Sequence, residues 1–104
     1  MAKKVGKRKQ KNETIIVKRK GHREIFDERK VYGSVYAACA SMHYPERHCE
    51  VTAAHVTRLI KKWAKPKRTI SSVAIRKKVA SELKKKDKEL EFFYEYHLPN
   101  LKKL

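Results

Sequence analysis

The feature that most constrains the fold is a helical repeat of apolar residues that recurs four times along the chain. The repeats cover residues 31–42, 49–63, 75–83 and 90–98, with apolar side chains at steps of three and four. This spacing places apolar residues on one face of a helix. The sequence therefore predicts four amphipathic helices. Their predicted buried stripes are Val31, Val35, Ala38, Cys39 and Met42; Cys49, Ala53, Val56, Ile60 and Trp63; Ile75, Val79 and Leu83; and Leu90, Phe93, Tyr94, His97 and Leu98.

Residues that start and stop helices flank each repeat. Asp and Ser side chains accept hydrogen bonds from the first free amides of a helix, and Pro fits the first helical position but not the interior. The predicted starts are Asp27, Pro45 at the first position of the second helix, Ser71 or Ser72, and Asp87, and the predicted stops of the second and fourth helices are Pro66 and Pro99.

A short hairpin is predicted before the first helix. Residues 14–18 are rich in β-branched side chains, and residues 23–26 form the returning strand after a turn at Gly21. Residues 68–70 add a short edge strand before the third helix. The expected fold is therefore of the α+β class, a four-helix cluster capped by a small N-terminal β-hairpin sheet.

The charge of the chain favours polyanionic partners. Its 104 residues include 28 Lys and Arg against 11 Asp and Glu, a formal net charge of +17. The basic stretch 1–13 has too few apolar residues to fold alone, and its cations are candidates for nucleic-acid contact, as is the basic segment 61–68. The alternative for this tail is a solubilising terminus. The tail cations are Lys3, Lys4, Lys7, Arg8, Lys9 and Lys11.

Other classes of protein receive little support. No apolar run is long enough to cross a bilayer and no secretory signal is evident, so we expect a cytoplasmic protein without a membrane partner. Cys39, His43, His48, Cys49 and His55 match no zinc module, and both cysteines fall on predicted core stripes, so no metal cluster is expected. No nucleophile elbow, carboxylate pair or phosphate loop is present, so we expect no enzyme.

The hairpin and the helix after it suggest a ligand site. Lys18, Arg19 and Lys30 are predicted to converge near the amides of the helix N-terminus, which favour an anion such as a phosphate group. Ile16, Phe26 and Val31 would form an apolar wall for a planar base, and the lone Glu24 would accept a hydrogen bond from an adenine amino group. The alternative is a charged hairpin that only covers the core.

Two motifs resemble the ATP-cone domain family. The run "IVKRKGHREIFDERKV" at residues 16–31 is similar to that family's apolar-x-Lys-Arg-x-Gly hairpin, which leads to a Lys-apolar pair on the first helix. The run "ISSVAI" at residues 70–75 is similar to the Ile-Ser-Ser-x-x-Ile signature of its third helix, and "FFYEY" at residues 92–96 has the aromatic character of its last helix. The resemblance covers about residues 14–98, with tails at 1–13 and 99–104.

The resemblance implies a non-catalytic regulatory module that senses ATP against dATP, as in domains fused to ribonucleotide reductases or to the repressor of their genes. The resemblance implies that Lys18, Arg19 and Lys30 bind the phosphates and that Glu24 faces the adenine. It also implies that Ile16, Phe26 and Val31 lie around the base. It adds Ser72 and Arg76 near the sugar or phosphates. The chain departs from the family at Lys20, where Asp or Asn is common, and at Arg76, where reductase-linked members often carry His.

Two functions follow as hypotheses. The first is an adenine-nucleotide sensor that binds ATP or dATP, with or without magnesium, and signals by ligand-dependent association with itself or a protein partner. Neither a reductase barrel nor the cysteines of a zinc ribbon are present, so a free-standing domain is expected. The second is a basic protein that binds DNA or RNA, with a role in transcription and with the nucleotide domain as regulator or degenerate.

Overall fold

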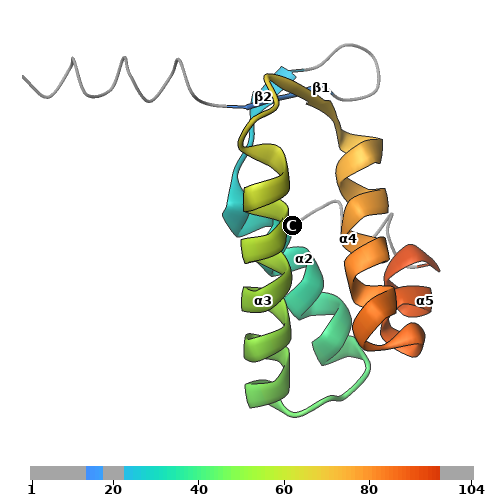
Figure 1. Cartoon of the computed structure of the whole chain (residues 1–104). Helices are drawn as coiled ribbons and strands as arrows, with labels where there is room; N and C mark the ends of the chain where they lie inside the picture. The colour runs from blue at the N-terminus through green and yellow to red at the C-terminus, as the bar shows by residue number, and fades with distance from the viewer. Residues whose placement is uncertain (1–13, 18–22, 97–104) are drawn as a thin grey trace, which may run out of the picture.

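A computed structural model of the protein describes residues 14–17 and 23–96. Within these residues, three short strands lie at one end of a cluster of four helices (Figure 1). The predicted α+β class and the small N-terminal sheet are therefore confirmed. The elements are β1 (Ile15–Val17), β2 (Arg23–Ile25), α2 (Glu28–Ser41), α3 (Glu46–Ala64), β3 (Thr69–Ser71), α4 (Ser72–Lys86) and α5 (Lys88–Tyr96).

The sheet has the order β2-β1-β3, with β1 in the centre. β1 pairs antiparallel with β2, so that Ile16 lies opposite Glu24, and parallel with β3, so that Ile16 also lies beside Ile70. The predicted hairpin strands and the edge strand are thus confirmed. The parallel pairing follows from the chain path, since α2 and α3 carry the chain away from the sheet and back to it.

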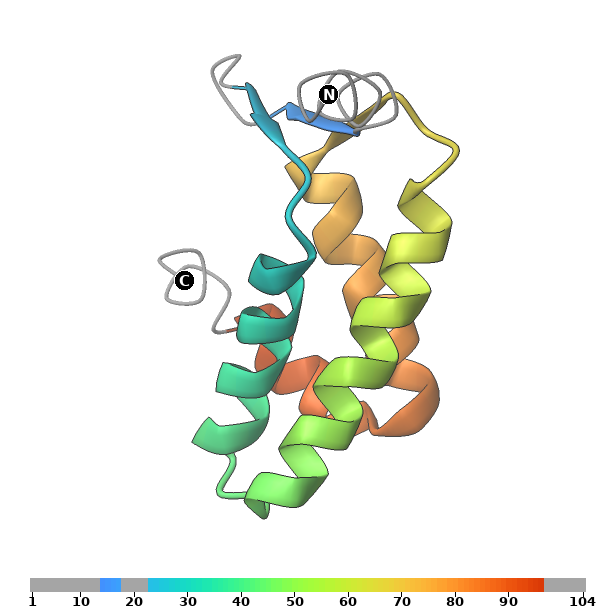
Figure 2. The same ribbon diagram turned by 90° about the vertical axis from the view of Figure 1, so that its left-hand side faces the viewer.

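The helices pack in two layers that share one core. α3 and α4 run antiparallel and side by side, α2 packs against α3, and α5 packs against α4 and α2 (Figures 1 and 2). The predicted stripes are buried within the described residues, except that Met42, Trp63 and Phe93 are only partly buried at the edge of the core. The predicted continuation of the last helix through His97 and Leu98 lies outside the described residues.

Three of the predicted helix starts are confirmed by their side-chain bonds. The carboxylate of Asp27 accepts from the Arg29 amide, the Ser71 hydroxyl accepts from the Ala74 amide, and Asp87 accepts from the amides of Glu89 and Leu90. The second helix was predicted to begin at Pro45, which is one residue too early. Pro45 is the cap itself, with an extended ψ of 145°, and its carbonyl accepts the first helical bond from the Cys49 amide.

Thr14 fastens the sheet to the helices. Its hydroxyl lies 3.0 Å from the carbonyl oxygen of Ala64 and 2.8 Å from that of Lys67, and the Ile15 amide donates to the Arg68 carbonyl at 2.9 Å. The Thr14 side chain is buried, so these contacts satisfy a hydroxyl that would otherwise destabilise the fold. The start of β1 is thereby held against the end of α3.

Asp87 joins the turn before α3 to the start of α5. Its Oδ2 accepts a hydrogen bond of 2.7 Å from the Tyr44 hydroxyl, while its Oδ1 caps α5. Burial alone would raise the pKa of Asp87, but the bonds from Tyr44 and from the Leu90 and Glu89 amides outweigh it and hold the pKa below its usual value.

Replacement of Asp87 by Ala is expected to lower the free energy of unfolding by about 2 kcal/mol near neutral pH, because the variant loses a helix cap and the bond from Tyr44. Tyr44→Phe, which removes only that bond, should lower it by about 1 kcal/mol. The pKa is lowered in the folded state, so the contribution is present above about pH 4 and is lost as the pH falls further. Urea denaturation across this range measures it; a Tyr44→Phe effect as large as that of Asp87→Ala would contradict the capping role.

Candidate functional site

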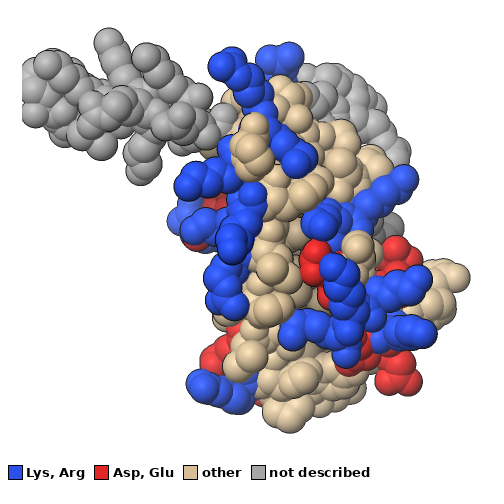
Figure 3. Space-filling model, in the orientation of Figure 1, with Lys and Arg blue, Asp and Glu red and all other residues tan. Residues whose placement is uncertain are grey.

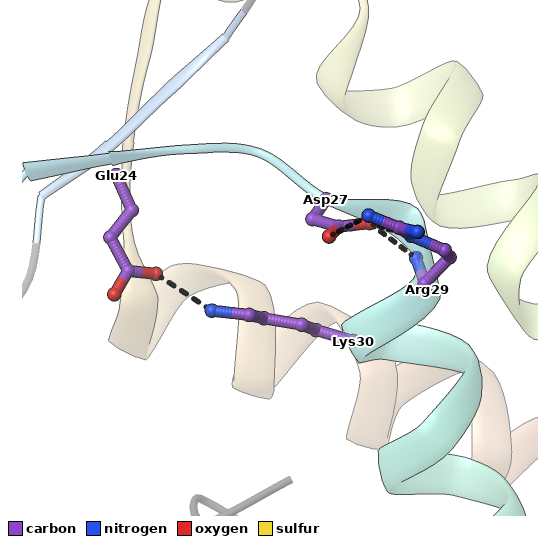
Figure 4. A network of polar contacts seen from close by, with 4 residues as sticks. All are labelled: Glu24, Asp27, Arg29 and Lys30. Atoms are coloured by element: carbon purple, nitrogen blue, oxygen red, sulfur yellow. Dashed lines mark hydrogen bonds and ion pairs between the residues drawn. The ribbon is translucent and has the colours of Figure 1, made fainter.

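The junction between β2 and α2 brings several of the predicted site residues together. Glu24 is the central residue of β2, and the pairing with β1 continues through a bond of 2.8 Å from the Phe26 amide to the Thr14 carbonyl. The chain then enters α2 at the Asp27 cap, so that Lys30 lies in the first turn of the helix. Figure 4 shows the Glu24 and Lys30 side chains extending toward one another from these two elements.

Glu24 and Lys30 form an ion pair. The Lys30 Nζ lies 3.2 Å from Glu24 Oε1, and the two side chains are 55% and 36% exposed. An ion pair this exposed contributes little to stability, so a ligand can replace it at small cost. Glu24, predicted to contact a base, therefore lies next to Lys30, predicted to contact a phosphate.

The N-terminus of α2 is capped by the side chain of Asp27. Asp27 Oδ1 accepts from the Arg29 amide at 2.9 Å, and the Asp27 carbonyl accepts from the Lys30 amide at 3.0 Å. The Arg29 guanidinium also donates a hydrogen bond to each carboxylate oxygen of Asp27. These bonds hold the pKa of Asp27 below its usual value. Asp27 therefore caps α2 at the place where an anion was expected, and a phosphate beside these amides stays a prediction.

The three apolar candidates belong mainly to the core. Ile16 is 9% and Val31 6% exposed, and both are members of the core cluster beneath the junction. Phe26 is partly buried and packs against that cluster. A contact between these side chains and a base remains a prediction.

Ser72 and Arg76 lie on α4 and are both half-buried. Ser71 rather than Ser72 caps the helix, which resolves the choice that the sequence left open. Arg76 lies close enough to Tyr94 for its charge to lower the pKa of that phenol, although burial has the larger effect and raises it. Arg76 therefore faces the place where α4 meets α5.

Ser34 was not singled out from the sequence, and Tyr94 was predicted only as a core residue. The Ser34 hydroxyl donates to the Val31 carbonyl at 2.9 Å and lies 3.3 Å from the Tyr94 hydroxyl. Ser34 follows Lys30 by one helical turn, so both point from the same side of α2. The spacing of four residues from Lys30 could have indicated Ser34 from the sequence. Together with Arg76 they give α2, α4 and α5 a shared polar seam.

The remaining candidates are not placed. Lys18 and Arg19, and the tail cations Lys3, Lys4, Lys7, Arg8, Lys9 and Lys11, lie outside the described residues. Their roles remain predictions from the sequence.

The cysteines belong to the core. Cys39 and Cys49 are fully buried, and burial together with a hydrogen bond from Cys49 raises the pKa of Cys39 to about 12. A thiol with that pKa stays protonated near neutral pH and is a poor metal ligand. Within residues 14–17 and 23–96, no three His, Cys, Asp or Glu side chains are grouped as a metal site. Among the described helices none is both long enough and apolar enough to span a membrane.

Comparison with known proteins gives one match. The family model described as the ATP cone domain matches residues 14–96, which is most of the chain. No curated protein and no solved structure matches the chain.

Proposed function

Because the chain belongs to the ATP-cone domain family, whose members are in general nucleotide-binding regulatory modules and not catalysts, we propose that it senses ATP or dATP without catalysing a reaction. The observation that carries the proposal is the Glu24–Lys30 pair at the junction of β2 and α2. A partly exposed carboxylate and an exposed ammonium at 3.2 Å, on residues that neighbour Ile16 and Val31 of the core, suit a ligand with a hydrogen-bonding base and an anionic chain.

In the proposed complex, Lys18, Arg19 and Lys30 hold the phosphates through charge-assisted bonds. Glu24 releases Lys30 and accepts from the adenine amino group. Ile16, Phe26 and Val31 lie against the base, and Ser72 and Arg76 are near the sugar or phosphates. Magnesium, where present, would be held chiefly by phosphate oxygens, because Glu24 and Asp27 both face cations of the protein.

The proposed signal is a change in association with a second copy or with a protein partner. A formal charge of +17 opposes self-association, and each bound triphosphate reduces that repulsion. Ligand binding and oligomer formation then stabilise one another. We place this domain at residues 14–98, between basic and short C-terminal tails, in the cytoplasm.

Calorimetric titration of the full chain with ATP, dATP and GTP, with magnesium and at moderate salt, tests the proposal. Saturable binding of the adenine nucleotides with much weaker binding of GTP is the expected result. Equal, weak responses to all three that disappear with added salt would overturn it, because net charge alone would then account for them.

Lys30→Ala is expected to weaken ATP binding about tenfold or more, since the variant loses a charge-assisted phosphate contact. Lys61→Ala is a matched control: Lys61 is 54% exposed and pairs with Glu28 at 2.9 Å, also at the start of α2. Both variants remove one charge and one exposed ion pair. Titration with ATP compares them, and an equal loss in both would rule out a specific role for Lys30.

A further inference from the structure

A second cationic surface lies on a different face of the bundle. Figure 3 shows Lys and Arg side chains gathered over α3 and along α4, with uncharged atoms between the two rows. Arg58 and Lys62 of α3 and Lys65, which caps its C-terminus, are all exposed and are spaced four and three residues apart, so they share one side of the helix. We call the basic face the six cations Arg58, Lys62 and Lys65 at α3 and Lys78, Lys85 and Lys86 of α4.

The two rows lie on helices that pack against one another side by side. His55 of α3 is close enough to Lys86 and Glu82 of α4 for both charges to act on it; burial is the main cause that lowers the pKa of His55, and Lys86 and Arg58 lower it further. Glu82 in turn lies 3.2 Å from the Lys78 ammonium and 3.6 Å from that of Lys85. The basic face therefore spans two adjacent helices.

The charge of this surface is largely uncompensated. Glu82 is a single carboxylate, only 10% exposed, and two lysines share it. Among the described residues, no carboxylate forms an ion pair with Lys62, Lys65 or Lys86. Helix dipoles explain cations in a last turn, such as Lys62 and Lys86. They do not explain Arg58 and Lys78, which lie further inside their helices.

We propose that the basic face binds the phosphate backbone of double-stranded nucleic acid, in addition to the nucleotide proposed for the β2–α2 junction. The rows of α3 and α4 extend roughly 10 Å each along their helices, at 1.5 Å per residue. Duplex DNA carries one charge per about 1.7 Å of axis, so several phosphates lie within reach of such a surface.

Two observations favour a duplex backbone over other polyanions. Proteins that bind single strands stack bases on aromatic rings, but the ring of Trp63, next to Lys62 in the chain, is covered by the Lys67 ammonium at 4.7 Å. A helix that inserts into a membrane surface uses large apolar side chains beside its cations, whereas the exposed aromatic residues Phe92 and Tyr96 lie on α5. Contacts to phosphates alone do not read base sequence.

The test compares charge-matched variants of the full chain. Lys62, Lys65 and Lys86 are replaced together by Gln in one variant; in the control, Arg23, Arg47 and Lys88 are replaced by Gln. These control cations are exposed and lie outside the basic face. A third variant replaces the six tail cations, Lys3, Lys4, Lys7, Arg8, Lys9 and Lys11, by Gln. Fluorescence anisotropy with a labelled DNA duplex of mixed sequence measures affinity at several salt concentrations.

We expect the basic-face variant to lose about tenfold or more in affinity and to reduce the slope of log K against log salt by about 3. The control should change affinity less than about threefold. An equal loss in both triple variants, or a loss confined to the tail variant, would overturn the proposal, as would tighter binding to poly-glutamate or to phosphatidylserine vesicles than to the duplex. ATP titration of the basic-face variant keeps the two proposals separate, since its nucleotide affinity should be unchanged.

Discussion

Simultaneous replacement of Lys18 and Arg19 by Ala is expected to weaken ATP binding by at least about a hundredfold, to below the detection limit of calorimetry. Each side chain is proposed to donate a charge-assisted hydrogen bond to a phosphate, and a bond of this kind contributes about 1.5–3 kcal/mol. The free energy of unfolding should stay the same, because both are charged residues that lead into the turn predicted at Gly21. Titration with ATP and urea denaturation of the same preparation measure the two quantities.

A matched control separates a specific site from attraction by net charge. Arg47 lies in the first turn of α3, and Lys88 is the first residue of α5. Both helices begin at the end of the bundle opposite the sheet (Figure 1). The Arg47→Ala and Lys88→Ala double variant removes the same two charges. It should bind ATP within about twofold of the natural protein, since exposed charges at that distance are screened by salt. Equal losses in both double variants would refute the phosphate roles of Lys18 and Arg19.

Leu83→Ala is expected to lower the free energy of unfolding by about 3–4 kcal/mol. Leu83 is fully buried on α4, in the core that α4 shares with α3 and α5, and truncation there leaves a cavity that the packed helices cannot close. A domain of this size is stable by only about 5–15 kcal/mol, so the loss is a large fraction of the total. The shift of the urea midpoint measures it.

Val73→Ala on the same helix provides the comparison. Val73 is 44% exposed, so its truncation should change the free energy of unfolding by less than about 1 kcal/mol. If the two substitutions had similar effects, the inward face of α4 would have been assigned incorrectly.

The fold was predictable from the sequence where a local pattern determines it. The period of Val31, Val35 and Ala38 gave a buried helix face, and Asp27 and Asp87 gave helix starts, because each depends only on neighbours in the chain. The start of α3 was predicted one residue too early, at Pro45, since proline geometry suits both the cap and the first helical position. The buried role of Thr14 depends on carbonyls about fifty residues away, which no local pattern can indicate.

The candidate site was predictable in part. The sequence placed Lys30 near the hairpin, because Asp27 fixed the start of α2 three residues earlier. It did not predict that Lys30 pairs with Glu24, since the directions of two long side chains depend on the register of β2 against β1. The contact between Ser34 and Tyr94 was not predicted, because one lies on α2 and the other on α5, and they meet only when the bundle is assembled.

The central position of β1 has a consequence for the order of folding. α2 and α3 are neighbours in sequence and pack directly, so their contacts form early, whereas β1 must join β3 across a separation of about fifty residues. The sheet should therefore form last and open first, without unfolding of the bundle. Amide hydrogen exchange should be faster at Ile15 than in the middle of α3. Adenine nucleotide bound at the β2–α2 junction would slow exchange most in these strands.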